Sequence, residues 1–164
     1  MKNKNFSKQV SVVGGGGHIG LPLSCLIQNN GYEVLIVDNN IKAIKAIKKG
    51  QTPFYEKGLE KNLKNALKKG LTLSKNIENI KFSKFVIVTI GTSSTKKSID
   101  LFNSLLNKVL INMENEASLI LRSTVTENDI AKIKKNKHYI NKNIKLTYCP
   151  ERIAEGSAFE ELGS

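Results

Sequence analysis

The sequence of 164 residues lacks tryptophan and contains only two cysteines and two histidines. The cysteines, Cys25 and Cys149, lie far apart in the sequence and match no metal-ligand spacing. This cysteine usage favours a reducing, cytoplasmic compartment and a fold without a disulfide framework. No apolar run approaches the ~20 residues that a membrane-spanning helix requires, so we expect no membrane association. Residues 1–9 are polar and basic, which is typical of a short lead into a strand rather than of a signal peptide.

Acidic residues are also scarce, with 14 Asp and Glu against 26 Lys and Arg, and the formal net charge is +12. The lysines are spread along segments such as "IKAIKAIKKG" and "EKNLKNALKKG", in which apolar residues recur at helical spacing. This pattern indicates solvated helix faces, so we expect no nucleic-acid partner. The positive electrostatic field of these lysines can still attract anionic nucleotides. A basic nucleic-acid-binding protein stays an alternative, and it predicts strongly salt-sensitive retention on DNA.

Strand-like and helix-like segments alternate along the whole chain. The expected strands are Val10–Val13, Glu33–Val37, Leu71–Leu73, Phe85–Ile90, Ser118–Leu121 and Ile144–Tyr148. Helices are expected over residues 19–30, 41–49, 59–69 and 101–113 and after Thr126, while His138 is expected in an exposed loop. This alternation predicts an α/β fold, a Rossmann-type doubly wound parallel sheet in three α/β/α layers, forming one domain over residues 10–164.

The segment "VSVVGGGGHIGLPLS", residues 10–24, places a glycine-rich turn between a strand and a helix. Such a turn presents backbone amides to a phosphate at the helix N-terminus. Two registers compete: Gly15, Gly17 and Gly20 follow G-x-G-x-x-G, whereas Gly14, Gly16 and Gly20 need one more residue in the turn. The first register is favoured because it has the standard spacing of a dinucleotide-binding turn. His18 is expected to contribute its backbone amide rather than a catalytic imidazole.

Asp38 ends the second expected strand, where a carboxylate can accept hydrogen bonds from the adenosine ribose. It would repel a 2′-phosphate, and no arginine stands beside it, so NAD is favoured over NADP. The clusters "GTSS", "RSTV" and "CPER" also follow strands and should meet at the same sheet edge. Structural roles stay open for all of them: Asp38 as a solvated turn residue, Ser123-Thr124 as a helix cap, and Glu151-Arg152 as a surface ion pair.

Six segments, taken in order and spacing, resemble the N-terminal NAD-binding domain of the UDP-glucose/GDP-mannose dehydrogenase family. They are "VSVVGGGGHIGLPLS", "VDNN", "TPFYEKGLEKNL", "VIVTIGT", "LILRSTV" and "YCPERIAEG", and the likeness runs over about residues 10–162. "CPERIAEG" is most similar to the members that act on UDP-N-acetylated hexosamines. The resemblance implies oxidation of the sugar C6 alcohol to a carboxylate in two NAD-dependent steps, through an aldehyde and a cysteine thioester.

The resemblance also implies a role for each matching residue, with no metal among them. Cofactor binding is implied for Gly15, Gly17, His18, Ile19, Gly20, Asp38, Thr92 and Thr124. Thr124 and Glu151 would act in thioester hydrolysis, the first by orienting a water and the second as an acid/base, and Glu151 and Arg152 would lie near the UDP-sugar substrate. A positioned water and a carboxylate that takes its proton are what this hydrolysis requires.

The sequence departs from the family pattern in three places and in its length. Ser93 replaces the usual proline, the loop after it is basic, and Ala43 replaces a common lysine. The central helix and the C-terminal UDP-sugar domain, with the nucleophilic cysteine, are absent, and neither Cys25 nor Cys149 fits that role. We therefore expect the chain to bind NAD without turnover unless the missing domain is supplied. No oligomeric state is predicted.

Two further alternatives use the same glycine-rich turn. A non-catalytic Rossmann module that senses NAD or another nucleotide would fold and bind NAD without any downstream partner domain. A methyltransferase would bind S-adenosylmethionine at the turn, but it explains "RSTV" and "CPER" less well, and failure of that ligand to protect against heat would exclude it.

Overall fold

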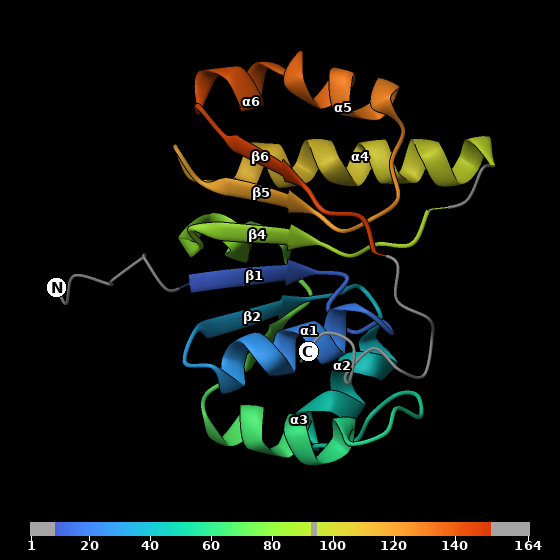
Figure 1. Ribbon diagram of the computed structural model, residues 1–164, viewed down its shortest axis with the longest axis vertical. Helices are drawn as coiled ribbons and strands as arrows, with labels where there is room; N and C mark the ends of the chain where they lie inside the picture. The colour runs from blue at the N-terminus through green and yellow to red at the C-terminus, as the bar shows by residue number, and fades with distance from the viewer. Residues whose placement is uncertain (1–8, 93–94, 152–164) are drawn as a thin grey trace, which may run out of the picture.

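The computed structural model describes residues 9–92 and 95–151, and its centre is a six-stranded sheet (Figure 1). The strands are β1 (Gln9–Val13), β2 (Glu33–Val37), β3 (Thr72–Ser74), β4 (Phe85–Val88), β5 (Ser118–Leu121) and β6 (Lys145–Tyr148). Their order is β3-β2-β1-β4-β5-β6, and every neighbouring pair is parallel. This order is that of the doubly wound dinucleotide-binding fold, so the predicted fold class is confirmed.

Helices cover both faces of the sheet. On one face lie α1 (Gly20–Asn29), α2 (Ile41–Lys48) and α3 (Leu59–Lys68), which form one buried cluster with the strands. On the other face α4 (Lys96–Asn112), α5 (Glu127–Lys134) and the 3₁₀ helix η2 (Ile77–Phe82) form a second cluster, with α6 (Lys137–Asn141) beside them. The short, β-branched strands β1, β2 and β4 are largely buried between these layers, as is usual for parallel strands. Among residues 9–92 and 95–151, none of the helices combines the length and the apolar character of a membrane span.

Three local expectations were wrong. Helix α4 begins at Lys96 rather than near residue 101, because Thr95 caps it by accepting a hydrogen bond from the Ser98 amide at 3.3 Å. The first turn of α4 is polar and shows no apolar periodicity, so its sequence does not predict a helix start at Lys96. Helices η2 and α6 were not predicted, and His138 lies half-buried in α6 rather than in an exposed loop.

The carboxyl ends of the strands meet at one edge of the sheet, on the right in Figure 1. The backbone ladder extends one residue beyond the strands there: the amides of Gly14, Arg122 and Cys149 donate to neighbouring strand carbonyls at 2.8–2.9 Å. The glycine turn, Asp38 and the loops after β4, β5 and β6 therefore lie along the same edge. For their described residues, this confirms that the polar clusters of the sequence converge where such folds bind ligands.

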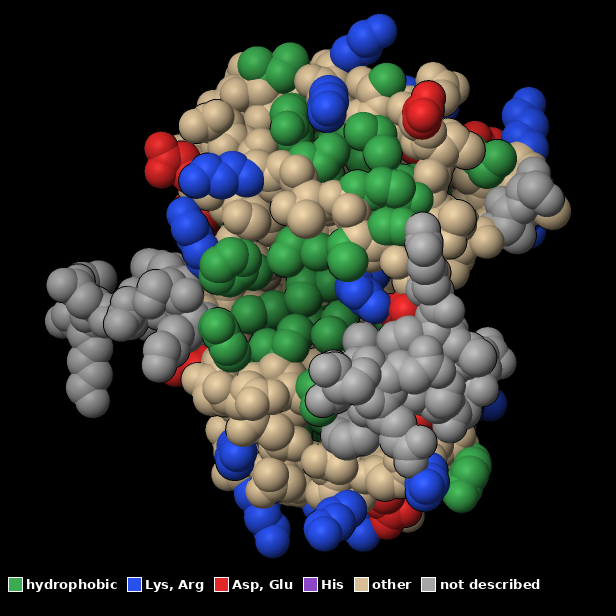
Figure 2. Space-filling view, in the orientation of Figure 1, with side chains coloured by type: hydrophobic (Ala, Val, Ile, Leu, Met, Phe, Trp, Pro, Cys, Tyr) green, Lys and Arg blue, Asp and Glu red, His purple; other side chains and the backbone are tan. Residues whose placement is uncertain are grey.

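One part of the sheet is less covered than the rest. Helix α1 lies in front of β2 in Figure 1, with α2 and α3 beside it, whereas no described helix lies in front of β5 and β6. Phe85 of β4 and Ile120 of β5 are only partly buried on this face, and Figure 2 shows hydrophobic side chains gathered there. Parallel sheets are normally covered on both faces, so this surface is available to further polypeptide.

Helix α5 begins with a reciprocal cap that makes a stability prediction. The Thr126 hydroxyl accepts from the Asp129 amide at 3.2 Å, and the Asp129 carboxylate accepts from Thr126. The hydrogen bond from the Thr126 side chain is the main cause that lowers the pKa of Asp129. Thr126→Ala should lower the free energy of unfolding by about 1 kcal/mol in urea titrations at pH 7. Thr124→Ala, which removes no cap, should change it little.

The pH dependence of this cap has a definite sign. Because folding lowers the pKa of Asp129, its contribution is complete above the unfolded value near 4 and disappears as the pH falls through the folded value. The difference between wild type and Thr126→Ala should therefore shrink below about pH 4. A difference that grows on acidification would contradict the assignment of the Asp129–Thr126 pair.

Candidate functional site

The glycine turn begins where β1 ends and closes on helix α1. Gly14 has a φ of +82°, and the Gly17 amide donates to the Gly14 carbonyl at 3.2 Å. A Cβ at Gly20 would lie 2.4 Å from the Gly14 carbonyl oxygen and 2.6 Å from the Gly15 Cα. Helix α1 can therefore approach β1 only because position 20 has no side chain, as expected of the third glycine in either register.

The remaining glycines differ in what restricts them. A Cβ at Gly15 would meet the Ile36 side chain and the Val12 carbonyl at 2.9 Å, and one at Gly16 would meet the Asp38 carboxylate at 2.9 Å. At Gly17 the first atom met would be the Gly14 carbonyl oxygen at 3.4 Å, which is an ordinary contact. The folded chain therefore does not itself require a glycine at position 17.

Three backbone amides are open at the start of α1. Within residues 9–92 and 95–151, the amides of His18, Ile19 and Gly20 have no hydrogen-bond partner, and no side chain caps the helix. The first amides of a helix need external acceptors, and the helix dipole favours a negative one. This end of α1 lies at the carboxyl edge of the sheet and has the chemistry of a phosphate site.

Asp38 follows β2 and is half-buried beside the turn. Its carboxylate accepts from the Gly16 amide at 2.9 Å and from the Asn40 amide at 2.8 Å. A carboxylate offers about four acceptor positions, so these two bonds leave room for hydroxyl donors. The interpretation of Asp38 as a merely solvated turn residue is therefore too simple, because the carboxylate also braces the turn.

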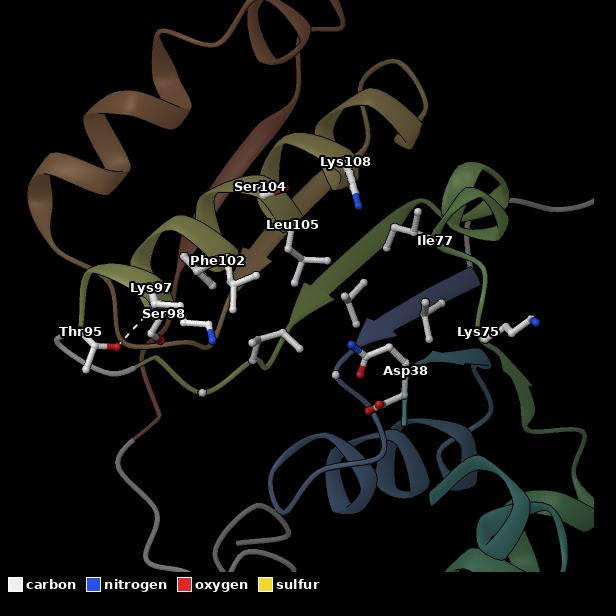
Figure 3. Close-up of a pocket in the computed structure, with 17 residues that line it drawn as sticks. Asp38, Lys75, Ile77, Thr95, Lys97, Ser98, Phe102, Ser104, Leu105 and Lys108 are labelled. Carbon is white, nitrogen blue, oxygen red and sulfur yellow. Dashed lines mark hydrogen bonds between the residues drawn. The ribbon is translucent and has the colours of Figure 1, made fainter. Parts of the chain in front are cut away.

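A cavity of about 570 Å³ opens between the carboxyl ends of β1, β2 and β4 and helix α4 (Figure 3). Apolar side chains form its walls, among them Ile90 from the loop after β4 and Phe102 and Leu105 from α4. Asp38 lines one side, and Lys108 of α4 points toward the cavity from the other. Flat apolar walls with a few polar groups at the rim suit a nucleoside.

The loops after β4 and β5 are joined by the two threonines that the sequence singled out. The Thr92 hydroxyl donates to the Thr124 backbone carbonyl at 2.6 Å. Thr124 is exposed and does not cap the following helix, because Thr126 performs that function. The alternative role of Ser123-Thr124 as the cap of α5 is therefore wrong.

Glu151 is paired with an arginine that sequence reasoning missed. The Arg122 guanidinium donates to the Glu151 carboxylate, and 16% and 13% of the two side chains are exposed. The Glu151 amide also donates to the Arg122 carbonyl at 3.1 Å, which fixes the two loops together. The proposed surface pair with Arg152 is not tested, because Arg152 lies outside the described residues, as does Ser93.

The two cysteines are free and lie in different surroundings. Cys25 is buried in α1, and burial raises the pKa of its thiol to about 12, so it stays a protonated core group. Cys149 is exposed at the carboxyl edge, where the Arg122 guanidinium donates to its Sγ at 3.4 Å. In the described part of the chain, no group of three His, Cys, Asp or Glu side chains could hold a metal ion.

Sequence reasoning also missed the contact between the glycine turn and the loop after α2. The His18 and Phe54 rings are stacked with centroids 4.0 Å apart and planes inclined by 26°. The residues are far apart in the sequence, and the only signal was that His18 is the first side chain after four glycines. A contact of this kind depends on the path of a loop, which local patterns do not specify.

Comparison with known proteins identifies the family of this chain. The model of the UDP-glucose/GDP-mannose dehydrogenase family, NAD binding domain, matches residues 8–164. The UDP-N-acetyl-D-mannosamine dehydrogenase of Methanococcus vannielii is 32% identical over 166 residues, covering 97% of this chain and 38% of that protein. A solved structure of the UDP-N-acetyl-mannosamine dehydrogenase of Staphylococcus aureus is 28% identical, with a TM-score of 0.79 over 94% of this chain and 39% of that one.

A further structure, the UDP-D-ManNAc dehydrogenase of Pyrococcus horikoshii, superposes with a TM-score of 0.83 at 24% identity. The superposition covers 94% of this chain and 38% of that one, and it supports the fold. The chain thus spans about two-fifths of the length of these relatives. The match of the family model over nearly all residues, together with the strand order and the open turn, shows that this chain belongs to the UDP-glucose/GDP-mannose dehydrogenase family and is its NAD binding domain.

Proposed function

We propose that this chain is the cofactor-binding part of a nucleotide-sugar 6-dehydrogenase that acts on a UDP-N-acetylhexosamine. The observation that carries the proposal is the row of open amides at residues 18–20, which lies on the same sheet edge as Asp38 and the cavity. The amides would hold the pyrophosphate of NAD. Because only Gly17 is free of packing constraints, the register Gly15, Gly17 and Gly20 is supported, with position 17 kept bare for the ligand.

The adenosine half of NAD would occupy the cavity beside α4. Its adenine would lie between Ile90 and Leu105, and the two remaining acceptor positions of Asp38 would bind the ribose hydroxyls. A 2′-phosphate would approach the same carboxylate and be repelled, which favours NAD over NADP. Lys108 supplies positive charge on the opposite wall and attracts the dinucleotide without neutralising Asp38 directly.

The acid/base group for thioester hydrolysis would be Glu151, with Thr124 orienting the water. The Arg122 guanidinium holds the Glu151 carboxylate in place, so that it can accept the proton of the attacking water. Thr92 supports the arrangement through its bond to the Thr124 carbonyl. The nicotinamide of bound NAD would supply the hydride acceptor. Arg152 is proposed to lie near the substrate.

We propose that the remaining parts of the reaction are carried by polypeptide outside residues 1–164. Its relatives are more than twice as long, and in this family the nucleophilic cysteine and the UDP-sugar domain follow the NAD-binding domain. The uncovered apolar surface near Phe85 and Ile120 is available for that domain. We also propose a UDP-sugar substrate and no nucleic-acid partner. The two free cysteines favour a cytoplasmic location.

Calorimetric titration of the chain with NAD and with NADP tests the proposal. We expect NAD to bind, NADP to bind at least about tenfold more weakly, and no turnover of UDP-N-acetylhexosamines without the missing domain. Equal binding of the two dinucleotides would contradict the role of Asp38. No binding of NAD, with steep salt-dependent retention on DNA instead, would favour a nucleic-acid-binding protein.

A further inference from the structure

The glycine turn has few features that hold it in one conformation. Residues 14–17 are all glycine, which adopts many backbone conformations and loses much freedom when it is fixed. Hydrogen bonds from the Gly16 amide to Asp38 and from the Gly17 amide to the Gly14 carbonyl fix its first half. In the second half, which begins at His18, the amides of residues 18–20 donate no hydrogen bond, and the helix holds it through the Ile19 carbonyl, which accepts from the Leu23 amide at 3.2 Å.

The His18 side chain is held from outside the turn. Its ring stacks on Phe54 at 4.0 Å between centroids, and Phe54 in turn packs against the buried cluster beneath α1 and α3. Phe54 lies in the loop between α2 and α3, which comes to the carboxyl edge of the sheet in Figure 1. The aromatic contact therefore connects the part of the turn with the open amides to the hydrophobic core.

We infer that Phe54 is a positioning residue for the pyrophosphate site, a role that rests on the proposed binding of NAD. By stacking on His18, Phe54 holds the open amides of residues 18–20 in the direction that a pyrophosphate requires before the ligand arrives. A site that is already ordered loses less conformational freedom on binding, so its affinity is higher. Phe54 itself touches neither the phosphates nor the reacting atoms.

Four variants test this role by calorimetry. Phe54→Ala and Phe54→Leu should both lower the affinity for NAD and ADP-ribose about two- to tenfold, because neither side chain can stack on His18. The leucine variant keeps the apolar volume, so its loss of affinity reports on the flat ring alone. Phe54→Tyr, which keeps the flat ring, should bind NAD with wild-type affinity. Tyr55→Ala removes the neighbouring side chain, which is 87% exposed, and should have no effect.

Three further measurements separate positioning from general damage. Adenosine, which lacks the pyrophosphate, should bind every variant as it binds wild type in NMR titrations. His18→Ala should lower NAD affinity as much as Phe54→Ala, and the double variant should lose no more than either one. In the unliganded protein, Phe54→Ala should speed hydrogen exchange at the Leu21 amide, whose hydrogen bond to the Gly17 carbonyl at 3.0 Å spans residues 18–20.

The inference is overturned if Phe54→Ala leaves NAD affinity unchanged, if adenosine loses affinity equally, or if the effects of the His18 and Phe54 variants simply add. If the wild-type protein does not bind NAD at all, the proposed function is overturned as well. If the wild-type protein and the Phe54 variants bind NAD equally well, only the positioning role of Phe54 is overturned. Unchanged amide exchange in Phe54→Ala would contradict the preordering step by itself.

Discussion

Replacing Gly20 by alanine is expected to destabilise the fold and abolish NAD binding. The new Cβ would lie 2.4 Å from the Gly14 carbonyl oxygen and 2.6 Å from the Gly15 Cα. Both neighbours are backbone atoms, so the strand, the turn or helix α1 must move. We expect the free energy of unfolding to fall by about 3 kcal/mol, the upper end for overpacked sites. Urea unfolding measures this loss, and calorimetry measures the binding.

Gly17→Ala is the matched control because it separates folding from binding. Its Cβ would make only a 3.4 Å contact with the Gly14 carbonyl oxygen, and position 17 does not have a positive φ. Stability should therefore change by less than about 1 kcal/mol, the difference in helical preference between glycine and alanine at most. NAD affinity should still fall about tenfold or more, because the methyl group enters the space of the pyrophosphate. Unchanged affinity would contradict the register Gly15, Gly17 and Gly20.

The second large effect is expected from Asp38→Ala. This variant removes the acceptors for the ribose and also the bonds from the amides of Gly16 and Asn40. Leaving donors without acceptors costs about 1–3 kcal/mol, so the affinity for NAD should fall about five- to 150-fold. The preference for NAD over NADP should disappear, because the negative charge that repels a 2′-phosphate is gone. Titrations with both dinucleotides measure the two effects.

Asn40→Ala separates cofactor contact from local stability at the same strand end. The Asn40 side chain accepts from the Ala43 amide at 3.1 Å as the cap of α2 and does not line the cavity. Its loss should lower stability by about 1 kcal/mol while the ratio of NAD to NADP affinity stays as in wild type. If Asn40→Ala changed that ratio as Asp38→Ala does, the assignment of Asp38 to the ribose would be wrong.

The sheet could be predicted because its strands carry strong local patterns. Runs such as "VSVV", "EVLIV" and "FVIV" are short, apolar and bounded by glycine or polar residues, and each forms a buried parallel strand. Parallel strands in turn place every following loop at one edge, so the meeting of the turn, Asp38 and the later loops could be foreseen. Helices without an apolar stripe in their first turn, such as the start of α4 at Lys96, could not.

The pairings between loops were beyond the sequence. Arg122 and Glu151 are 29 residues apart, and their pairing depends on β5 and β6 being neighbours in register. The sequence offered only its neighbour Arg152 as an alternative partner for Glu151, because adjacent charges are the pattern visible in one dimension. The stacking of Phe54 on His18 likewise depends on where the loop between α2 and α3 runs. Tertiary contacts of loops require the assembled sheet before they can be read.

A crystal structure of the chain with NAD shows directly whether the dinucleotide binds at the carboxyl edge of the sheet. We expect the pyrophosphate over the amides of residues 18–20, the ribose hydroxyls on the Asp38 carboxylate, and the adenine in the cavity beside α4. NAD bound elsewhere on the protein, or a carboxyl edge that stays empty or filled by the chain's own side chains at saturating NAD, would contradict this placement.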